Sequence, residues 1–134
     1  MTYNQTTGEI RKDGILIGVG YSGHANGLNN PELEAIANIG PVPCGWWTIG
    51  SPFLHPKCGP YTMRLIPDKD TATFNRDGFL IHGDSKEFPG QELASDGCIV
   101  APPNVRSRIW QSSDHRLQVV SGLTAPDVTG EISV

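Results

Sequence analysis

The sequence predicts one mainly β domain with one or two short helices, and two observations lead to this prediction. The apolar residues occur in short runs, which is the usual pattern of strands. The 16 glycines and 11 prolines are spread between these runs as turns, without forming a linker or a low-complexity tail. A chain of 134 residues fits a single domain over residues 1–134, which can bury a core without a metal ion or disulfide.

The strands are assigned from runs bounded by turn residues. An N-terminal hairpin is expected over residues 2–18, because Asp13-Gly14 in its turn supplies the positive φ that tight hairpins need. Further strands are expected at Trp46–Ile49, Tyr61–Ile66, Phe79–Ile81, Cys98–Val100 and Leu117–Val120. The proline-rich residues 51–60 are expected to be a loop. Because strand side chains alternate, at most one of Trp46 and Trp47 is expected in the core.

Two short helices are expected between these strands. Asn30 suits an N-cap and Pro31 suits the first helical position, and Gly40-Pro41 ends this helix after about two turns. Asn104 is expected to cap the second helix, over residues 105–110.

Charge and hydropathy exclude several classes of function. The formal charge is −4 and no basic stripe is present, so the chain has no expected surface for nucleic acid. No apolar run reaches the roughly 18 residues of a membrane span. The first ten residues lack the features of a signal peptide, so we expect a protein made in the cytoplasm and exported by another route.

The cysteines and a glycine motif leave alternatives. Cys44 and Cys58 are close enough in sequence to form a disulfide in an oxidising compartment, and a reduced pair is an equal expectation. His55-x-x-Cys58 invites a zinc interpretation, but the spacings match no common zinc finger. Residues 18–23 read GxGxxG without a convincing helix behind them, which disfavours a dinucleotide site.

The stretch from Phe79 to Val100 is the expected centre of the chemistry. A buried strand delivers His82, and a second strand begins at Cys98, sixteen positions later. A loop of that length can return the chain and place an imidazole beside a thiol, the pairing that makes a thiolate at neutral pH. A lone cysteine in an apolar run is more often structural, but residues 95–97 form a turn whose N–H groups can face an oxyanion.

These residues carry a resemblance. His82-Gly83, followed by Ser95-x-Gly97-Cys98, is similar to the signature of the L,D-transpeptidase (YkuD-type) catalytic domain family. The family consists of all-β cysteine enzymes that act on peptidoglycan stem peptides, so the resemblance implies an L,D-transpeptidase-like β-sandwich or barrel and no cofactor or metal. The usual motif is Ser/Thr-His-Gly-Cys followed closely by Arg, whereas this chain has Asp96 in place of His and no adjacent Arg.

Several further segments resemble one subgroup of that family. They are TGEI, GYSGHANGLNNPE, NIGPVPCGWWTIG, IHGD, SDGCIV and the Arg-x-x-Ile of residues 106–109. In this order they resemble the small L,D-transpeptidase-like effectors delivered by type VI secretion systems, over most of residues 3–120. The resemblance implies a secretion-machine carrier, a cognate immunity protein, and action in the periplasm of a target bacterium.

The resemblance assigns roles to the residues that match the motif. Cys98 is the expected nucleophile and His82 the general base, while Gly97 and Cys98 offer N–H groups to an oxyanion and Ser95 orients the loop. Asp96 carries a charge that raises the pKa of a nearby thiol unless the side chain turns away.

Further candidates are assigned to substrate binding. Arg106, with Arg108 as its rival, is expected to bind a substrate carboxylate, because a guanidinium fork suits that group. His24 and Tyr21, in the glycine-rich segment, and Gly83 and Asp96, beside the motif residues, complete the candidate substrate-binding set.

The expected reaction is attack of Cys98 on the L,D peptide bond that follows meso-diaminopimelate in a tetrapeptide stem. Release of D-alanine leaves an acyl-enzyme, which water resolves in an L,D-carboxypeptidase and an amine resolves in an L,D-transpeptidase or in D-amino acid exchange. The alternative is a catalytically idle peptidoglycan-binding module of a phage or secretion particle. A protease acting on proteins is disfavoured, because no papain-like or caspase-like signature is present.

Overall fold

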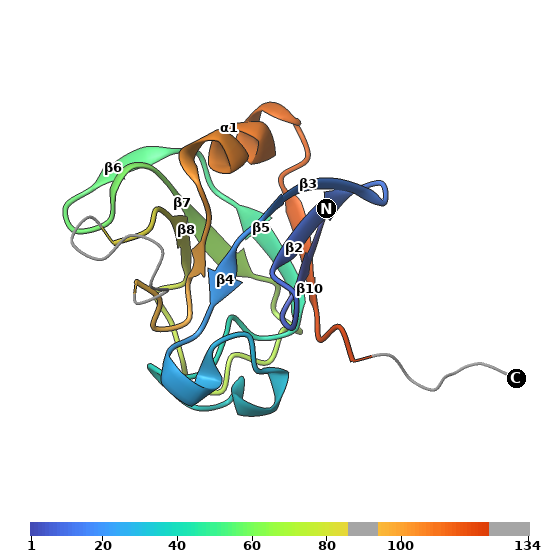
Figure 1. Cartoon of the computed structure of the whole chain (residues 1–134), viewed down its shortest axis with the longest axis vertical. Helices are drawn as coiled ribbons and strands as arrows, with labels where there is room; N and C mark the ends of the chain where they lie inside the picture. Colours follow the sequence, from blue (N-terminus) through green and yellow to red (C-terminus); the bar gives the residue numbers. More distant parts are fainter. Residues whose placement is uncertain (86–93, 124–134) are drawn as a thin grey trace, which may run out of the picture.

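The computed structural model describes residues 1–85 and 94–123, and it confirms the predicted mainly β fold (Figure 1). The strands are β1 (Thr2–Asn4), β2 (Glu9–Lys12), β3 (Ile15–Val19), β4 (Tyr21–Ser22), β5 (Gly45–Ile49), β6 (Phe53–His55), β7 (Gly59–Pro67), β8 (Leu80–His82), β9 (Ile99–Val100) and β10 (Arg116–Val120). The helical elements are the 3₁₀ turns η1 (Ala25–Gly27) and η2 (Pro31–Leu33) and the α-helix α1 (Pro103–Gln111).

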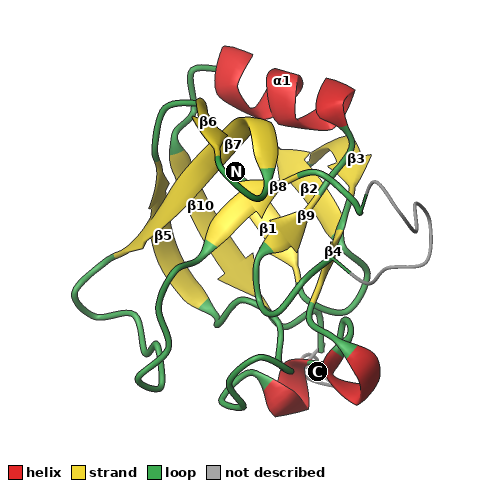
Figure 2. Cartoon of the chain, turned by 90° about the vertical axis from the view of Figure 1, so that its left-hand side faces the viewer, coloured by secondary structure: helices red, strands yellow, loops and turns green. Residues whose placement is uncertain are grey.

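The strands form one mixed sheet in the order β3-β2-β1-β10-β5-β7-β8-β9-β4, with β6 paired to β7. The pairs β1–β10 and β8–β9 are parallel, and the other pairs are antiparallel. The sheet curls around its core, and α1 lies across one end of it (Figure 2). The parallel pair β8–β9 joins two segments that the sequence singled out as one site.

The core consists of apolar side chains from most of the strands and from α1. Trp47 is fully buried, donates its indole N–H to the carbonyl of Pro43 at 3.1 Å, and meets Phe79 edge to face at 5.1 Å. Trp46, next in sequence, is 42% exposed, so the alternation predicted for this pair is confirmed.

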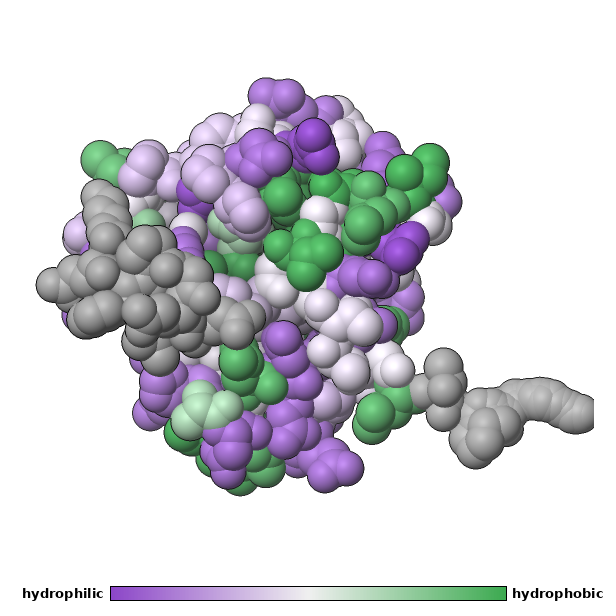
Figure 3. Space-filling view, viewed as in Figure 1, coloured by the Kyte–Doolittle hydropathy of each residue, from purple (hydrophilic) through white to green (hydrophobic). Residues whose placement is uncertain are grey.

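The N-terminal hairpin is confirmed at β2 and β3. Asp13 and Gly14 have φ values of 52° and 79°, the pair of positive angles that a two-residue type I′ turn requires. Past this turn, β3 exposes the apolar side chains of Ile15, Leu16 and Val19, which form a hydrophobic patch at the upper right of Figure 3.

Three local predictions are wrong. Asn30 does cap a helical turn by accepting from the N–H of Glu32, but η2 is a single 3₁₀ turn instead of two α-helical turns. The segment predicted as a loop over residues 51–60 contains β6, which pairs with β7 across a short turn. Asn104 lies inside α1, because Pro103 takes the first helical position and Pro102 precedes it as the N-cap.

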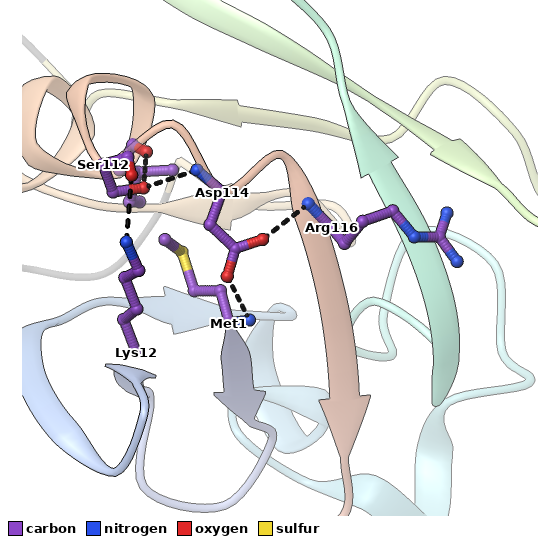
Figure 4. A network of polar contacts seen from close by, with 6 residues as sticks. Met1, Lys12, Ser112, Asp114 and Arg116 are labelled. Atoms are coloured by element: carbon purple, nitrogen blue, oxygen red, sulfur yellow. Dashed lines mark hydrogen bonds and ion pairs between the residues drawn. The ribbon is translucent and has the colours of Figure 1, made fainter.

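A polar network ties the N-terminal strands to the segment after α1 (Figure 4). The Met1 ammonium group donates to Asp114 Oδ2 at 2.8 Å, and this hydrogen bond is the main cause of the lowered pKa of Asp114. Lys12 Nζ donates to the carbonyl of Ser112 at 2.9 Å, and the N–H of Arg116 donates to Asp114 Oδ1 at 3.1 Å. These contacts stabilise the parallel pairing of β1 with β10.

Within residues 1–85 and 94–123, no helix is long and apolar enough to cross a membrane.

Replacing the two adjacent tryptophans tests this account of the core. Trp47→Ala removes a fully buried side chain, its indole hydrogen bond and its contact with Phe79. We expect a loss of about 3–5 kcal/mol in the free energy of unfolding. Trp46→Ala, the matched control on the exposed face, should cost about 1 kcal/mol, mostly for its contact with the Arg116 guanidinium. Urea titrations measure both values. Equal losses would contradict the assignment of Trp47 to the buried face of β5 and of Trp46 to its exposed face.

Candidate active site

Strand register brings His82 and Cys98 together. In the parallel pair β8–β9, Ile81 lies opposite Ile99 and His82 lies opposite Val100. Cys98 precedes β9 and lies two residues before Val100, so it falls on the same side of the sheet as His82, one step along the strands. Within the described part of the chain, no hydrogen bond joins the two side chains. The register therefore places His82 and Cys98 on the same side of the sheet, two residues apart along the strands.

The backbone carbonyl of Gly83 orients His82. The Nδ1 atom lies 2.8 Å from that oxygen, and because a carbonyl only accepts, Nδ1 must carry the proton and Nε2 the lone pair. Burial lowers the pKa of His82, and the Gly83 carbonyl partly opposes this effect. Arg106 and His55 lower the pKa further. At neutral pH the imidazole is therefore uncharged and ready to accept a proton.

Cys98 is held as a thiol in this structure. Burial raises its pKa to about 11, and the N–H of Leu80 is the main opposing influence. The sulfur itself contacts the carbonyl of Gly78 at 3.7 Å. We expected a thiolate at neutral pH from the sequence, and the structure instead pairs a neutral thiol with a neutral imidazole. Asp96 raises the pKa only as a lesser contribution, because its side chain is exposed.

The turn before Cys98 is built around the hydroxyl of Ser95, which is fully buried. Its Oγ donates to the carbonyl of Cys98 at 2.6 Å, and accepts from the N–H groups of Gly23 at 2.9 Å and Gly97 at 3.0 Å. The Gly97 N–H that we expected to face an oxyanion is therefore engaged inside the turn. Ser95 acts on the site by fixing the backbone that carries the sulfur.

A second buried serine supports the same turn from β4. Ser22 Oγ donates to the carbonyl of Gly97 at 3.2 Å and accepts from the N–H of Val42 at 2.8 Å. The sequence did not single out Ser22, because one serine in a glycine-rich segment carries no signal of its own.

Arg106 is directed at the His82-Gly83 backbone. Its side chain is buried, and its Nε and Nη1 atoms have no hydrogen-bond partner among residues 1–85 and 94–123. The guanidinium lies against Gly83, where a Cβ would come within 2.7 Å of Nη1. Arg108 instead donates to the carbonyl of Ile17 on β3 at 3.1 Å and is exposed. Of the two arginines, Arg106 alone neighbours the imidazole.

The remaining candidates lie at different places around the site. Tyr21 donates its hydroxyl hydrogen to Asp84 Oδ1 at 2.7 Å and accepts from the N–H of Ala94 at 3.1 Å, so it joins the chain just after His82 to the turn before Cys98. The main chain of His24 is bound to Ile39, and its buried Nδ1 has no partner in the described residues.

Two pockets open beside these residues. One, of about 210 Å³, contains Cys98. It is lined by Ala37, Asn38, Asn75, Arg76, Asp77, Gly78, Phe79, Asp96, Gly97 and Cys98. The other, of about 280 Å³, is lined by Val19, Gly20, Tyr21, Asp84, Val100, Ala101 and Pro102. Neither lining includes His24.

The turn between β6 and β7 also belongs to this neighbourhood, which the sequence did not predict. A positive charge on His55 would lower the pKa of His82, and a thiolate at Cys58 would raise the pKa of Cys98. His55 Nδ1 accepts from the N–H groups of Lys57 and Cys58, both at 3.0 Å, which fixes this turn. Only the pairing of β6 with β7 brings these residues close to the site.

The three cysteines are free, so the structure does not contain the disulfide considered for Cys44 and Cys58. In the described part of the chain, no group of three or more His, Cys, Asp or Glu side chains is arranged to hold a metal ion.

A neutral imidazole at the end of one strand and a cysteine just before the strand parallel to it, in a curled, mainly β domain, fit the class of L,D-transpeptidase-like domains. Residues 18–123 match the family described as the Tlde1 domain. The chain belongs to this YkuD-like family of type VI secretion L,D-transpeptidase effectors. No curated protein and no solved structure matches the chain. Family membership implies a peptidoglycan substrate and an effector delivered to a target periplasm.

The protonation state of Cys98 can be measured directly. Because its pKa is raised to about 11, the thiol remains protonated at neutral pH and ionises only as the pH approaches that value. We expect iodoacetamide to alkylate Cys98 at pH 8 roughly tenfold or more slowly than the same cysteine in the unfolded chain. The rate should still rise above pH 9. Peptide mapping by mass spectrometry distinguishes Cys98 from the other cysteines. A pH midpoint of the alkylation rate at or below 8.5 would contradict the raised pKa of Cys98.

Proposed function

We propose that this protein is a cysteine enzyme that cleaves the peptide bond between meso-diaminopimelate and D-alanine in the tetrapeptide stems of peptidoglycan. The observation that carries the proposal is the pairing of Cys98 with a neutral His82 whose Nδ1 proton is held by Gly83. This arrangement supplies a nucleophile and a base of known tautomer. Family membership supports peptidoglycan as the substrate.

The reaction follows from the two neutral groups. As the sulfur of Cys98 attacks the carbonyl carbon of meso-diaminopimelate, His82 Nε2 accepts the thiol proton, so no free thiolate has to accumulate. The imidazolium then protonates the nitrogen of D-alanine, the C–N bond breaks, and a thioester remains on Cys98. Hydrolysis of this thioester by water completes an L,D-carboxypeptidase reaction. An amine gives a cross-link or an exchanged D-amino acid.

Arg106 is the proposed partner of a substrate carboxylate. Both meso-diaminopimelate and the terminal D-alanine carry one. A buried guanidinium beside His82, whose Nε and Nη1 atoms have no hydrogen-bond partner among the described residues, is strongly stabilised by such an anion. Gly83 leaves the space that the guanidinium occupies. Tyr21 and Asp96 line the two pockets beside the site, where they can contact the stem.

The biological setting is proposed from the family. An enzyme that cuts or rearranges stem peptides weakens the wall of the cell that receives it, which fits antibacterial delivery into a target periplasm by a type VI machine. A carrier component and a cognate immunity protein are the proposed protein partners.

One observation favours the second candidate, a wall-binding module without turnover. A thiol with a pKa of about 11 is a poor nucleophile unless a base assists it. With Nδ1 held by the carbonyl of Gly83, His82 carries its lone pair on Nε2 and can act as that base, which favours the enzyme.

Digestion of purified tetrapeptide muropeptides tests the proposed activity. We expect the wild-type protein to release D-alanine, and mass spectrometry of the digest measures this release. Cys98→Ala and His82→Ala should each lower the rate at least 10³-fold, because the nucleophile or its base is gone. Cys44→Ala is the matched control, a cysteine that hydrogen bonds to Gln5 away from the site and should retain activity. Product formation by Cys98→Ala at the wild-type rate would disprove the assignment, and muropeptide binding without any product would establish the second candidate.

The two arginines of α1 form a matched pair for the carboxylate proposal. Arg106→Gln should lower kcat/KM by about 10- to 100-fold, the value of a charged hydrogen-bonded contact, whereas Arg108→Gln should change it less than twofold. Stems amidated at the D-alanine or at the diaminopimelate carboxylate identify the partner, because the wild-type enzyme should lose activity only on the stem that lacks the bound carboxylate. If Arg106→Gln discriminates between these stems as the wild type does, Arg106 binds neither group.

A further inference from the structure

The buried guanidinium of Arg76 has hydrogen bonds but forms no ion pair among the described residues. Its Nη1 donates to the carbonyls of Glu34 and Pro41, the latter at 2.9 Å, and its Nη2 donates to the carbonyls of Gly40 at 2.9 Å and Asp96 at 3.3 Å. The side chain is 8% exposed, and none of the ion pairs in the described part of the chain includes it. Carbonyl oxygens satisfy its N–H groups, and the charge of Glu34 acts on the guanidinium without forming an ion pair with it.

The local backbone shows that Arg76 is placed at a conformational cost. The two residues before it, Phe74 and Asn75, have φ values of 57° and 59°, a region that is rare for a bulky side chain. Phe74 is 44% exposed, so this turn is not explained by burial of the phenyl ring. Strain of this kind persists where the surrounding structure determines it, and it marks functional positions. What the turn delivers to the interior is the guanidinium.

That guanidinium lies against the residue that precedes Cys98. A Cβ at Gly97 would come within 2.3 Å of Arg76 Nη2, and Gly97 has a φ of 133°, so glycine is required there on both grounds. Arg76 and Cys98 line the same 210 Å³ pocket. Among the ionisable groups that interact with Arg76, Cys98 is the principal one that can gain a negative charge during a reaction.

We propose that Arg76 is the positioning residue that supplies the counter-charge for sulfur as Cys98 gives up its proton, and that it fixes the turn carrying this sulfur. This inference rests on the proposed role of Cys98 as nucleophile. The usual family motif has an arginine close behind the cysteine, and this chain has none there. Arg76 supplies a cation to the same sulfur from a turn 22 positions earlier in the sequence.

The charged and titratable groups around Cys98 act in opposite directions. Cys58, from the turn between β6 and β7, and Asp96, from the turn before the sulfur, raise the pKa of Cys98. Arg76 lowers it, and its guanidinium is the cation that acts on this thiol. His82, on β8, is neutral and receives the proton. Arg76 therefore acts in the opposite direction to Cys58 and Asp96, as the smallest of these three electrostatic influences.

Alkylation of Cys98 by iodoacetamide separates a charge role from a merely structural one by the sign of the change. If Arg76 supplies the counter-charge, Arg76→Gln should slow alkylation at pH 9 by about tenfold, the effect of one pKa unit. If Arg76 only holds the loops, its loss loosens the turn and exposes the thiol, and alkylation should become faster. Arg76→Lys retains the positive charge without the planar guanidinium, and its alkylation rate should stay within about threefold of that of the wild type.

Arg11→Gln is the charge-matched control, since it removes one exposed cation from β2 and should leave the rate unchanged. An unchanged or faster rate in Arg76→Gln overturns the proposal. If that variant does not fold, as judged by circular dichroism, Arg76→Lys decides: a rate more than tenfold faster than the wild type assigns Arg76 to structure alone. Because no muropeptide enters this assay, its result is independent of the digestion experiment. If the wild-type protein does not cleave muropeptides, the proposed function is overturned, but the electrostatic influence of Arg76 on Cys98 is not.

Discussion

The parallel pairing of β8 with β9 is the interaction on which the site depends. Parallel strands cannot be joined by a tight turn, so the chain must leave β8 and return before β9 can pair. That excursion supplies the turn at residues 95–97, and the register Ile81–Ile99 then fixes the position of Cys98 relative to His82 along the strands. A shift of one residue would turn Cys98 towards the core and Ile99 outward, so the apolar core itself maintains the register.

The same burial that fixes the strands also determines the electrostatics. A low-dielectric environment disfavours charge, so it raises the pKa of Cys98 and lowers that of His82. The two resting groups are consequently neutral. In the proposed reaction, charge develops only as the proton moves from sulfur to Nε2. The two buried guanidiniums in this region are Arg76, beside the turn before Cys98, and Arg106, beside Gly83. In the proposed reaction, Arg76 assists the nucleophile and Arg106 binds the substrate.

The sequence predicted those parts of the molecule that depend on local chemistry. The Asp13-Gly14 turn, the opposite orientations of Trp46 and Trp47, and the mainly β fold all follow from turn preferences and side-chain alternation, and they are confirmed. The β6 strand was missed, because the flanking Pro52 and Pro56 resemble a loop and only β7 gives the strand a partner. The helix after Asn30 was overestimated: its cap is correct, but only a single 3₁₀ turn forms behind it.

The site likewise contains residues that local sequence reveals and residues that only the fold brings together. A histidine and a cysteine at family spacing are visible in the sequence, whereas Arg76 and Ser22 act through backbone carbonyls and N–H groups that only the fold brings together. Burial was also invisible, and it reverses the expected protonation state of Cys98.

The most direct test of this account is the mass of the protein caught during turnover. After brief mixing with a tetrapeptide stem and acid quenching, the wild-type chain should gain the mass of the stem minus D-alanine, and fragmentation should place this acyl group on Cys98. His82→Ala should show almost none of this adduct. An adduct on another residue, or rapid release of D-alanine by a wild-type protein that never carries an adduct, would contradict the central claim that Cys98 forms a thioester with the help of His82.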